Sequence, residues 1–324
     1  MIHAAVAVII NDGSVLISKR PDHVHQGGLW EFPGGKVEDA ETIETALFRE
    51  IQEELGINIK ASRPLIKLAH CYPDKSVLLE TRLITDFDGR EYGLDKEQLG
   101  LERQLVKWVD LNKLDNYQFP AANKPILSAI QLPESYLISP DCSQKPETFL
   151  QQLSMSIQDN SLLQLRIKSL HGDKLDEMLK AACKIALKKQ SRILINSSMK
   201  VSDEINSGAS GIHLTSHHLH KKDFAETYQA QFPEKMTAAS CHNKEDIERA
   251  NQLGLDFIVI SPVQPTVSHP QQASLGWDNF KSLTDFARIP VFALGGLRLT
   301  DIPQAQNHGA QGIAAIRGLW NQAD

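Results

Sequence analysis

Cysteine is scarce in this sequence and never paired at short spacing. The four cysteines, Cys71, Cys142, Cys183 and Cys241, form no Cys-x-x-Cys motif, which argues against a zinc knuckle and against a dithiol redox site. Four scattered thiols in 324 residues favour a reducing compartment over a disulfide framework. We therefore expect a cytoplasmic protein that is held together by its hydrophobic cores.

Long apolar runs and an excess of positive charge are also missing. No run approaches the roughly 20 apolar residues that span a bilayer. The apolar residues 1–10 lack a basic segment and are followed by Asn11, Asp12 and Gly13, which favours a strand and a turn over a signal peptide. A net charge of -6 gives no basic field for a nucleic acid polymer. Small molecules, including anionic ones, remain as ligands, and we expect no membrane partner.

The composition is that of an ordinary globular protein, with 41% hydrophobic and 23% charged residues. The length suggests two domains. We place the joint at residues 131–134, because a proline and the residue before it both disfavour helix. The predicted domains span residues 1–131 and 135–324.

The two halves follow different patterns. In the first, strands are expected at 4–10, 15–19, 77–84 and 105–109, with a glycine-rich loop at 26–36 and a helix at 42–55, which together indicate an α+β layer fold. In the second, short apolar runs alternate with helical stretches such as 175–188 and 244–253, which indicates a small (β/α)8 barrel. Its eight predicted strands lie at 136–138, 162–166, 192–196, 211–214, 236–239, 257–261, 291–294 and 312–316.

The helix expected at 42–55 carries three carboxylates on one face. Glu50, Glu53 and Glu54 stand at i, i+3 and i+4, where like charges destabilise a helix by about 0.2–0.5 kcal/mol per pair. A hard divalent cation such as Mg²⁺ would remove that repulsion. Arg49, four residues before Glu53, can orient it. A solvated acidic surface is the alternative interpretation of such a helix taken alone.

The residues before this helix favour the metal interpretation. Gly34 and Gly35 allow the backbone to approach closely and offer a free carbonyl to a cation, and Lys36 adds a positive charge for a phosphate. Gly35, Glu41 and residues 49–57 together match the pattern Gly-x5-Glu-x7-Arg-Glu-U-x-Glu-Glu-x-Gly-U, with U apolar, at every specified position. The first half therefore resembles the Nudix family.

The resemblance implies an α/β/α sandwich and the Mg²⁺-dependent hydrolysis of a nucleoside diphosphate linked to another moiety, with Mn²⁺ able to substitute. The family varies in which group acts as general base, and Glu53 held by Arg49 is our candidate. The metal ligands that the resemblance implies are Gly34, Gly35, Glu50, Glu53 and Glu54, and the candidate catalytic residues are Glu53, Arg49 and Lys36.

Residues outside this motif indicate the substrate. Lys19-Arg20, His25, residues 31–36 and residues 119–125 resemble the MutT branch, over residues 1 to about 130. That branch cleaves (8-oxo-)dGTP to the monophosphate and pyrophosphate, which sanitises the nucleotide pool and avoids mutation in DNA replication and repair. The nucleotide-binding residues implied are Arg20, His25, Glu31, Phe32, Pro33, Gly34 and Asn123.

The chemistry of Asn123 agrees with this substrate, because an amide offers a donor and an acceptor side by side. It can read O6 together with the protonated N7 of 8-oxoguanine. A turn residue is the alternative role. The chain departs from the branch at Lys107, where members often carry a glutamate before the tryptophan, here Trp108. Glu97 or Glu102 are candidate substitutes.

The second half resembles the thiamine-phosphate synthase and TenI-like barrels over most of residues 136–320. The matching segments include 164–168, 208–214, 240–242, 261–263, 290–296 and 309–313. Glycines after the seventh and eighth strands lie where barrels usually bind phosphate. The implied phosphate or ligand residues are Arg166, Lys168, Asn196, His242, Gly295, Gly296, Arg317 and Gly318.

Parts of the synthase machinery are missing from this barrel. Asn196 is followed by Ser197 and Ser198 instead of an acid and an arginine, and the usual Thr-Lys after the sixth strand is Ser268-His269. We therefore expect no transferase activity. His242 matches the acid/base histidine of TenI-type tautomerases, with an idle loop histidine as the alternative. The histidines at 213, 217, 218 and 220 are interpreted as a solvated loop, not a metal site.

Three hypotheses follow. The first is a MutT-type 8-oxo-dGTP diphosphatase fused to a TenI-like barrel. The second is a thiamine-pathway enzyme whose Nudix half hydrolyses thiamine-related diphosphates and whose barrel is a thiazole tautomerase or a ligand-binding module. The third treats the barrel as a ligand-binding or assembly module without chemistry of its own.

Overall fold

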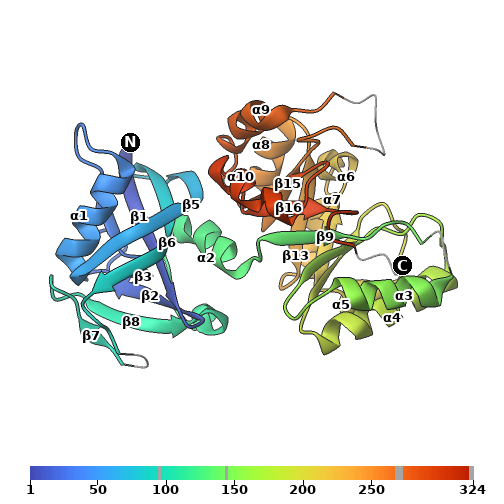
Figure 1. Ribbon diagram of the computed structural model, residues 1–324, viewed down its shortest axis with the longest axis horizontal. Coiled ribbons are helices and arrows are strands. Elements are labelled where there is room, and N and C mark those ends of the chain that lie inside the picture. The colour runs from blue at the N-terminus through green and yellow to red at the C-terminus, as the bar shows by residue number, and fades with distance from the viewer. Residues whose placement is uncertain (94–95, 143–144, 267–272, 321–324) are drawn as a thin grey trace. The chain divides into compact units, whose positions relative to one another are not determined.

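The computed structural model describes residues 1–93, 96–142, 145–266 and 273–320 (Figure 1). The chain divides into two compact units, Met1–Gln131 and Leu132–Asp324. Each unit has its own sheet and its own hydrophobic cores. None of the described helices combines the length and the apolarity needed to cross a membrane.

The first unit is built on one mixed sheet in the order β5-β6-β1-β2-β8-β7, with β3 paired to β2 and β4 paired to β1. The pair β1–β6 is parallel, and the other pairs are antiparallel. Its strands are β1 Ile2–Asn11, β2 Ser14–Lys19, β3 Trp30–Glu31, β4 Gly34–Lys36, β5 Ile57–Cys71, β6 Ser76–Gly89, β7 Gln98–Leu99 and β8 Leu105–Asp110. Its helices are α1 Ile43–Leu55, η1 Leu111–Asn116, η2 Ala121–Asn123 and α2 Lys124–Gln131.

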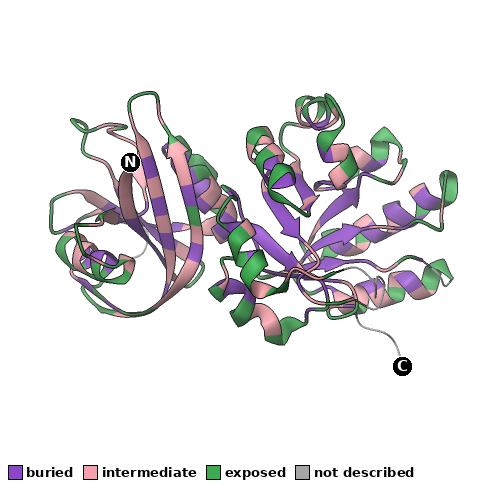
Figure 2. Cartoon of the chain, turned by 90° about the horizontal axis from the view of Figure 1, so that it is seen from above, coloured by how far each residue is buried: buried purple, intermediate pink, exposed green. Residues whose placement is uncertain are grey.

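Alternation along β1 gives the sheet two buried faces. Ala5, Ala7 and Ile9 belong to the core under α1, whereas Val6 and Val8 belong to the core that includes residues of α2. Figure 2 shows the buried residues of the strands. The sheet therefore lies between helices on both faces, which confirms the predicted α/β/α sandwich.

Helix α1 begins and ends where its capping residues require. The Thr42 hydroxyl accepts a hydrogen bond from the Thr45 amide at 3.2 Å, and Gly56 ends the helix in the left-handed conformation. Its apolar stripe, which includes Leu47 and Ile51, is buried against the sheet. The acidic residues are left on the side of the helix that the stripe does not occupy.

The glycine-rich segment at 26–36, predicted as a loop, contains two short strands. Trp30–Glu31 pairs with β2, and Gly34–Lys36 pairs with β1. The prediction was wrong here because such short strands are defined by pairing with residues distant in the chain, not by local alternation. Strand β4 fixes the two glycines beside α1.

The second unit is a closed barrel of eight parallel strands, as predicted. Every predicted strand is present, with the bounds of three identical to the prediction and those of the others within two residues of it. The strands are β9 Ser135–Ile138, β10 Leu162–Leu165, β11 Arg192–Asn196, β12 Gly211–Leu214, β13 Met236–Cys241, β14 Phe257–Ile260, β15 Val291–Leu294 and β16 Gly312–Ala315.

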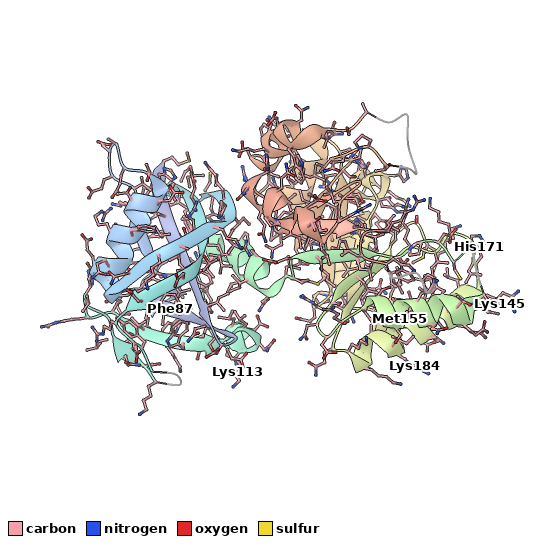
Figure 3. All side chains as sticks on the ribbon, in the orientation of Figure 1. Phe87, Lys113, Lys145, Met155, His171 and Lys184 are labelled. Atoms are coloured by element: carbon pink, nitrogen blue, oxygen red, sulfur yellow. The ribbon has the colours of Figure 1, made fainter. Side chains whose placement is uncertain are left out.

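The barrel helices are mostly short, which fits a compact barrel. They are α3 Pro146–Ser156, α4 Asp173–Lys188, α5 Asp203–Gly208, α6 Ser216–His220, α7 Phe224–Gln231, α8 Lys244–Leu253, α9 Gly276–Thr284, η3 Leu299–Asp301 and α10 Ile302–Asn307. Figure 3 labels Met155 on α3 and Lys184 on α4, which are both exposed. Inside the barrel, Tyr136, Phe257 and Phe292 pack with ring centroids 5.1–5.7 Å apart.

We expect the two units to unfold separately. Ile51→Ala removes a fully buried side chain of α1 and should destabilise the first unit by about 2–5 kcal/mol. Calorimetry of the full chain should then show one transition lowered and the other unchanged. The matched variant Ile258→Ala, in the barrel, should lower the other transition. A joint shift of both transitions by either variant would contradict separate unfolding.

Candidate active site

The site in the first unit is centred on the contact between α1 and the glycines of β4. A Cβ atom at residue 35 would overlap the Glu50 carboxylate, so this position of the carboxylate depends on a glycine at residue 35. The Gly34 amide donates a hydrogen bond to Glu54 Oε2 at 3.3 Å. Glu50 and Glu54 thus face β4, whereas the side chain of Glu53 is 54% exposed.

Arg49 connects the helix to the segments that precede it. Its Nε and Nη2 each lie 3.0 Å from a different carboxylate oxygen of Glu41, and Nη1 lies 2.9 Å from Glu50. Nη2 also donates to the Lys36 carbonyl at 3.2 Å. The contact with Glu53 is the longest, at 3.4 Å. Arg49 therefore holds Glu41 and Glu50 more closely than Glu53, the residue we expected it to orient.

Glu41 is a site residue whose role the sequence did not reveal. Its carboxylate also accepts a hydrogen bond from the Glu38 amide at 3.0 Å, so it joins the turn before α1 to Arg49. The hydrogen bond from Arg49 lowers the pKa of Glu41, and the same contact raises the pKa of Arg49. The only available signal was its fixed place in the motif.

The carboxylates near β4 crowd one another. Burial raises the pKa of Glu31, against the opposing effect of its ion pair with Arg20. Burial, followed by the negative charges of Glu31, Glu50 and Glu102, raises the pKa of Glu54 to about 8. A cation bound beside such a carboxyl group would stabilise its ionised form.

The donor set fits a hard divalent ion, because carboxylates and glycine carbonyls are the oxygen ligands that such ions prefer. Among the described residues, no three acidic, histidine or cysteine side chains already form a metal cage. Instead, Arg49 and the Gly34 amide bind Glu50 and Glu54. Each of these hydrogen bonds engages one carboxylate oxygen, which leaves the other oxygen of each group for a metal.

Three of the predicted nucleotide-binding residues, Phe32, Asn123 and His25, lie on or beside the face of the sheet opposite α1, whereas Gly34 and Glu31 lie near Glu54 of α1. Phe32 is buried and stacks on Phe119 at 5.6 Å. Asn123 is 8% exposed, and its Oδ1 has no hydrogen-bond partner among the described residues. His25 Nε2 is likewise buried without a partner among the described residues. Leaving such an atom buried without a hydrogen-bond partner costs about 1–3 kcal/mol of folding stability. Binding of a ligand to these atoms would explain why they are left unpaired.

Arg20 is held beside this face in a defined position. It pairs with Glu31, and its Nε donates to the His25 carbonyl at 3.1 Å. Glu31 in turn contributes to the charge around Glu54. Arg20 therefore connects the predicted nucleotide face with the carboxylates. Lys107, which stands where the MutT branch often has a glutamate, lies over the ring of Tyr117 at 5.7 Å.

A chain of neutral hydrogen bonds crosses the interior of the barrel. Asn196 Nδ2 donates to Gln164 Oε1 at 2.8 Å, and Gln164 Nε2 donates to the Tyr136 hydroxyl at 3.2 Å. Tyr136 Oη lies 3.1 Å from His213 Nδ1, and His213 Nε2 lies 2.9 Å from Ser240 Oγ. Burial lowers the pKa of His213 to about 3, so the imidazole is neutral at physiological pH.

The predicted barrel residues are only partly brought together. The Asn196 Oδ1 accepts hydrogen bonds from the amide and the hydroxyl of Ser198, at 3.0 and 2.6 Å. His242 is exposed, and its Nδ1 lies 2.9 Å from the Ser261 carbonyl. The other predicted residues lie at the ends of strands or just after them: Arg166, Lys168, Gly295, Gly296, Arg317 and Gly318. Ser268 and His269 lie outside the described residues.

Gly295 has a structural reason to be glycine. Its φ is 122°, and a Cβ there would lie 2.9 Å from the Val263 amide nitrogen and 3.0 Å from Pro262. The loop after β15 therefore packs directly on the loop after β14. Close backbone packing explains this glycine without a bound phosphate.

The histidine run was interpreted as a solvated loop, but His213 lies in a strand and the later histidines lie on helix α6, where His217 and His220 are exposed. His213 is buried inside the barrel, and His218 Nδ1 lies 2.8 Å from the Ser197 hydroxyl. His220 Nε2 lies 2.7 Å from the buried carboxylate of Asp246. Helix α6 carries the later histidines toward different partners, an arrangement that depends on the barrel and has no local sequence signal.

Comparison with known proteins relates each unit to a family. Residues 5–129 match the family described as NUDIX domain, and residues 135–319 match the family described as thiamine monophosphate synthase. The 8-oxo-dGTP diphosphatase of Escherichia coli (strain K12) is 34% identical over 128 residues, which cover 39% of this chain and 94% of that protein.

Two further relatives extend these matches. The CTP pyrophosphohydrolase of Escherichia coli (strain K12) is 33% identical over 129 residues, covering 40% of this chain and 90% of that protein. The putative thiamine-phosphate synthase 2 of Aquifex aeolicus (strain VF5) is 30% identical over 189 residues, covering 58% of this chain and 97% of that protein.

The raised pKa of Glu54 predicts a pH-dependent stability. A carboxyl whose pKa rises from 4.5 to about 8 on folding stabilises the fold fully below pH 4.5 and loses that contribution as the pH rises through 8. Glu54→Gln does not titrate. In EDTA it should therefore unfold at a higher temperature than the wild type above pH 8, with the difference vanishing at acid pH. A lower unfolding temperature for Glu54→Gln above pH 8 would contradict the assignment.

Proposed function

The chain belongs to the Nudix family through its first unit and to the thiamine monophosphate synthase family through its second, and we propose on this basis that it hydrolyses 8-oxo-dGTP to the monophosphate and pyrophosphate. The first unit is a hydrolase acting on nucleoside diphosphate derivatives. The observation that carries the proposal is the seating of Glu50 and Glu54 against the glycines of β4. The nucleotide relatives named above support the substrate class.

Glu50, Glu54 and a carbonyl of Gly34 or Gly35 would hold Mg²⁺, for which Mn²⁺ can substitute. When bound, the ion would neutralise the diphosphate oxygens and lower the pKa of the attacking water. Arg49 keeps Glu50 in place through its 2.9 Å contact and is itself held by Glu41. We assign Glu53 as the proton acceptor, because its carboxylate is the most exposed of the three.

The basic side chains would hold the phosphates and the sugar. Lys36 is exposed at the end of β4, next to the carboxylates, and can approach a phosphate of the substrate. Arg20 is oriented by Glu31 and by the His25 carbonyl, with donors remaining for a phosphate or sugar oxygen. Phe32 and Pro33 form the buried floor between these groups and the base.

Asn123 is the proposed reader of the base. Its buried Oδ1 lacks a partner among the described residues and can accept from the N7–H that oxidation creates, while Nδ2 donates to O6. Normal guanine offers only acceptors on that edge. Hydrolysis of the oxidised triphosphate removes it from the pool that polymerases use, so the proposed role is the avoidance of mutation.

For the barrel we propose a ligand-binding role without transferase chemistry. Ser197 and Ser198 stand where the synthases have an acid and an arginine, and both hydroxyls are engaged by His218 and Asn196. The interior hydrogen-bond chain is neutral, so it offers no charge to a pyrophosphate. Synthase or tautomerase turnover by the full chain would overturn this assignment.

Glu53→Gln should lower kcat for 8-oxo-dGTP by about 10²–10⁴-fold, because the amide cannot accept a proton from water. Release of pyrophosphate, not orthophosphate, is the measurement. Glu44→Gln is the matched control, since Glu44 lies on the same helix but pairs with Arg82 at 2.9 Å. Wild-type activity in Glu53→Gln, or faster turnover of thiamine diphosphate than of 8-oxo-dGTP, would refute the proposal.

Asn123→Ala should reduce discrimination between 8-oxo-dGTP and dGTP. The loss of one donor and one acceptor at the base should lower the ratio of their kcat/KM values about tenfold. Steady-state kinetics with both nucleotides give the ratio, and Asn116→Ala, at an exposed asparagine nearby, is the control. An unchanged ratio in Asn123→Ala would remove Asn123 from base recognition.

A further inference from the structure

Thr81 on β6 has a buried hydroxyl that no hydrogen bond of the fold accounts for. The residue is 2% exposed, and its Oγ1 has no partner among the described residues. A threonine hydroxyl in a strand usually bonds a neighbour or reaches water. Burying this hydroxyl without a hydrogen bond destabilises the fold. Its presence is explained if the hydroxyl bonds a ligand.

The register of the sheet places Thr81 on the face that carries the proposed nucleotide residues. Thr81 is aligned with Val6 on β1 and with Ile66 on β5, and both belong to the core of that face. Along β6, Val77 and Leu79 belong to the same core, so alternation turns Thr81 toward it. The face opposite α1 is therefore the one that Thr81 adjoins.

Three buried polar atoms without partners border this one face. Besides Thr81 Oγ1 they are Asn123 Oδ1 and His25 Nε2, among the described residues. Asn123 follows Ala122 of the same core, and the ring of His25 meets the ring of Tyr72, which packs on that core, at 5.0 Å. Unpaired polar groups converging on a face rich in aromatic rings are suited to the edge of a nucleobase.

We propose that Thr81 is a specificity-determining residue, whose hydroxyl hydrogen-bonds the base of the nucleotide that Asn123 also reads. The inference rests on the proposed function. A hydroxyl can donate and accept, so it can pair with an exocyclic amino group or a carbonyl of the base. It adds a polar contact to those that the Asn123 amide and His25 can supply on this face.

Thr81→Val tests this, because it deletes the hydroxyl and keeps the shape of the side chain. We expect the KM of the preferred nucleotide to rise about tenfold while kcat changes little, since one hydrogen bond to the base is lost. The unfolding temperature should stay equal or rise, because an unpaired buried hydroxyl is removed. Thr81→Ser restores the hydroxyl and should restore the KM.

The experiment uses the full chain with 8-oxo-dGTP, dGTP and CTP. Wild-type hydrolysis of none of the three would refute the proposed function. Wild-type hydrolysis with an unchanged KM in Thr81→Val would refute the inference alone, as would a Thr81→Ser variant that matches Thr81→Val. A higher KM together with undiminished stability in Thr81→Val, reversed by serine, supports it, because a merely structural hydroxyl would not move the KM selectively.

Discussion

The arrangement of the first unit depends on one guanidinium that balances several carboxylates. Arg49 contacts Glu41, Glu50 and Glu53, and it also bonds the end of β4 through the Lys36 carbonyl. Without the positive charge of Arg49, the neighbouring carboxylates of α1 would repel one another and destabilise the helix. The ion pairs of Arg49 do not include Glu54, and burial together with the nearby carboxylates raises the pKa of Glu54 to about 8. A cation bound beside Glu54 would favour the ionised form of this carboxyl group.

The barrel contrasts with this site in its electrostatics. Its interior polar groups are neutral, and each of the five linked side chains from Asn196 to Ser240 hydrogen-bonds the next. A buried His213 with a pKa of about 3 carries no charge at physiological pH. Such a network specifies the packing of the barrel core and can orient an uncharged ligand. It does not supply the charges that a pyrophosphate requires.

Local sequence signals predicted those features that depend on periodicity or fixed spacing. The eight barrel strands are short apolar runs of regular spacing, and the acidic helix has a motif with caps at Thr42 and Gly56. The short strands β3 and β4 were missed because each depends on a distant partner. Thr81 gave no signal, because an alternating strand does not reveal which of its polar residues stays unpaired.

The partner of a charged side chain was the least predictable feature. Arg49 stands four residues before Glu53, a spacing that predicts their pairing, yet its closest bonds go to Glu41 and Glu50. Glu41 precedes the helix, and only the folded turn brings it to Arg49. In the same way, the closed barrel sets the partners of His213 and His220. Sequence therefore indicated the chemical groups better than their contacts.

The proposed activity requires a divalent cation bound by Glu50 and Glu54 beside the β4 glycines. Anomalous diffraction from crystals of the full chain grown with Mn²⁺ tests it most directly. We expect a peak within about 2.6 Å of carboxylate oxygens of both residues, near a carbonyl of Gly34 or Gly35. The absence of a peak between the two carboxylates, with both still bonded only to Arg49 and the Gly34 amide, would show that they do not form this cation site.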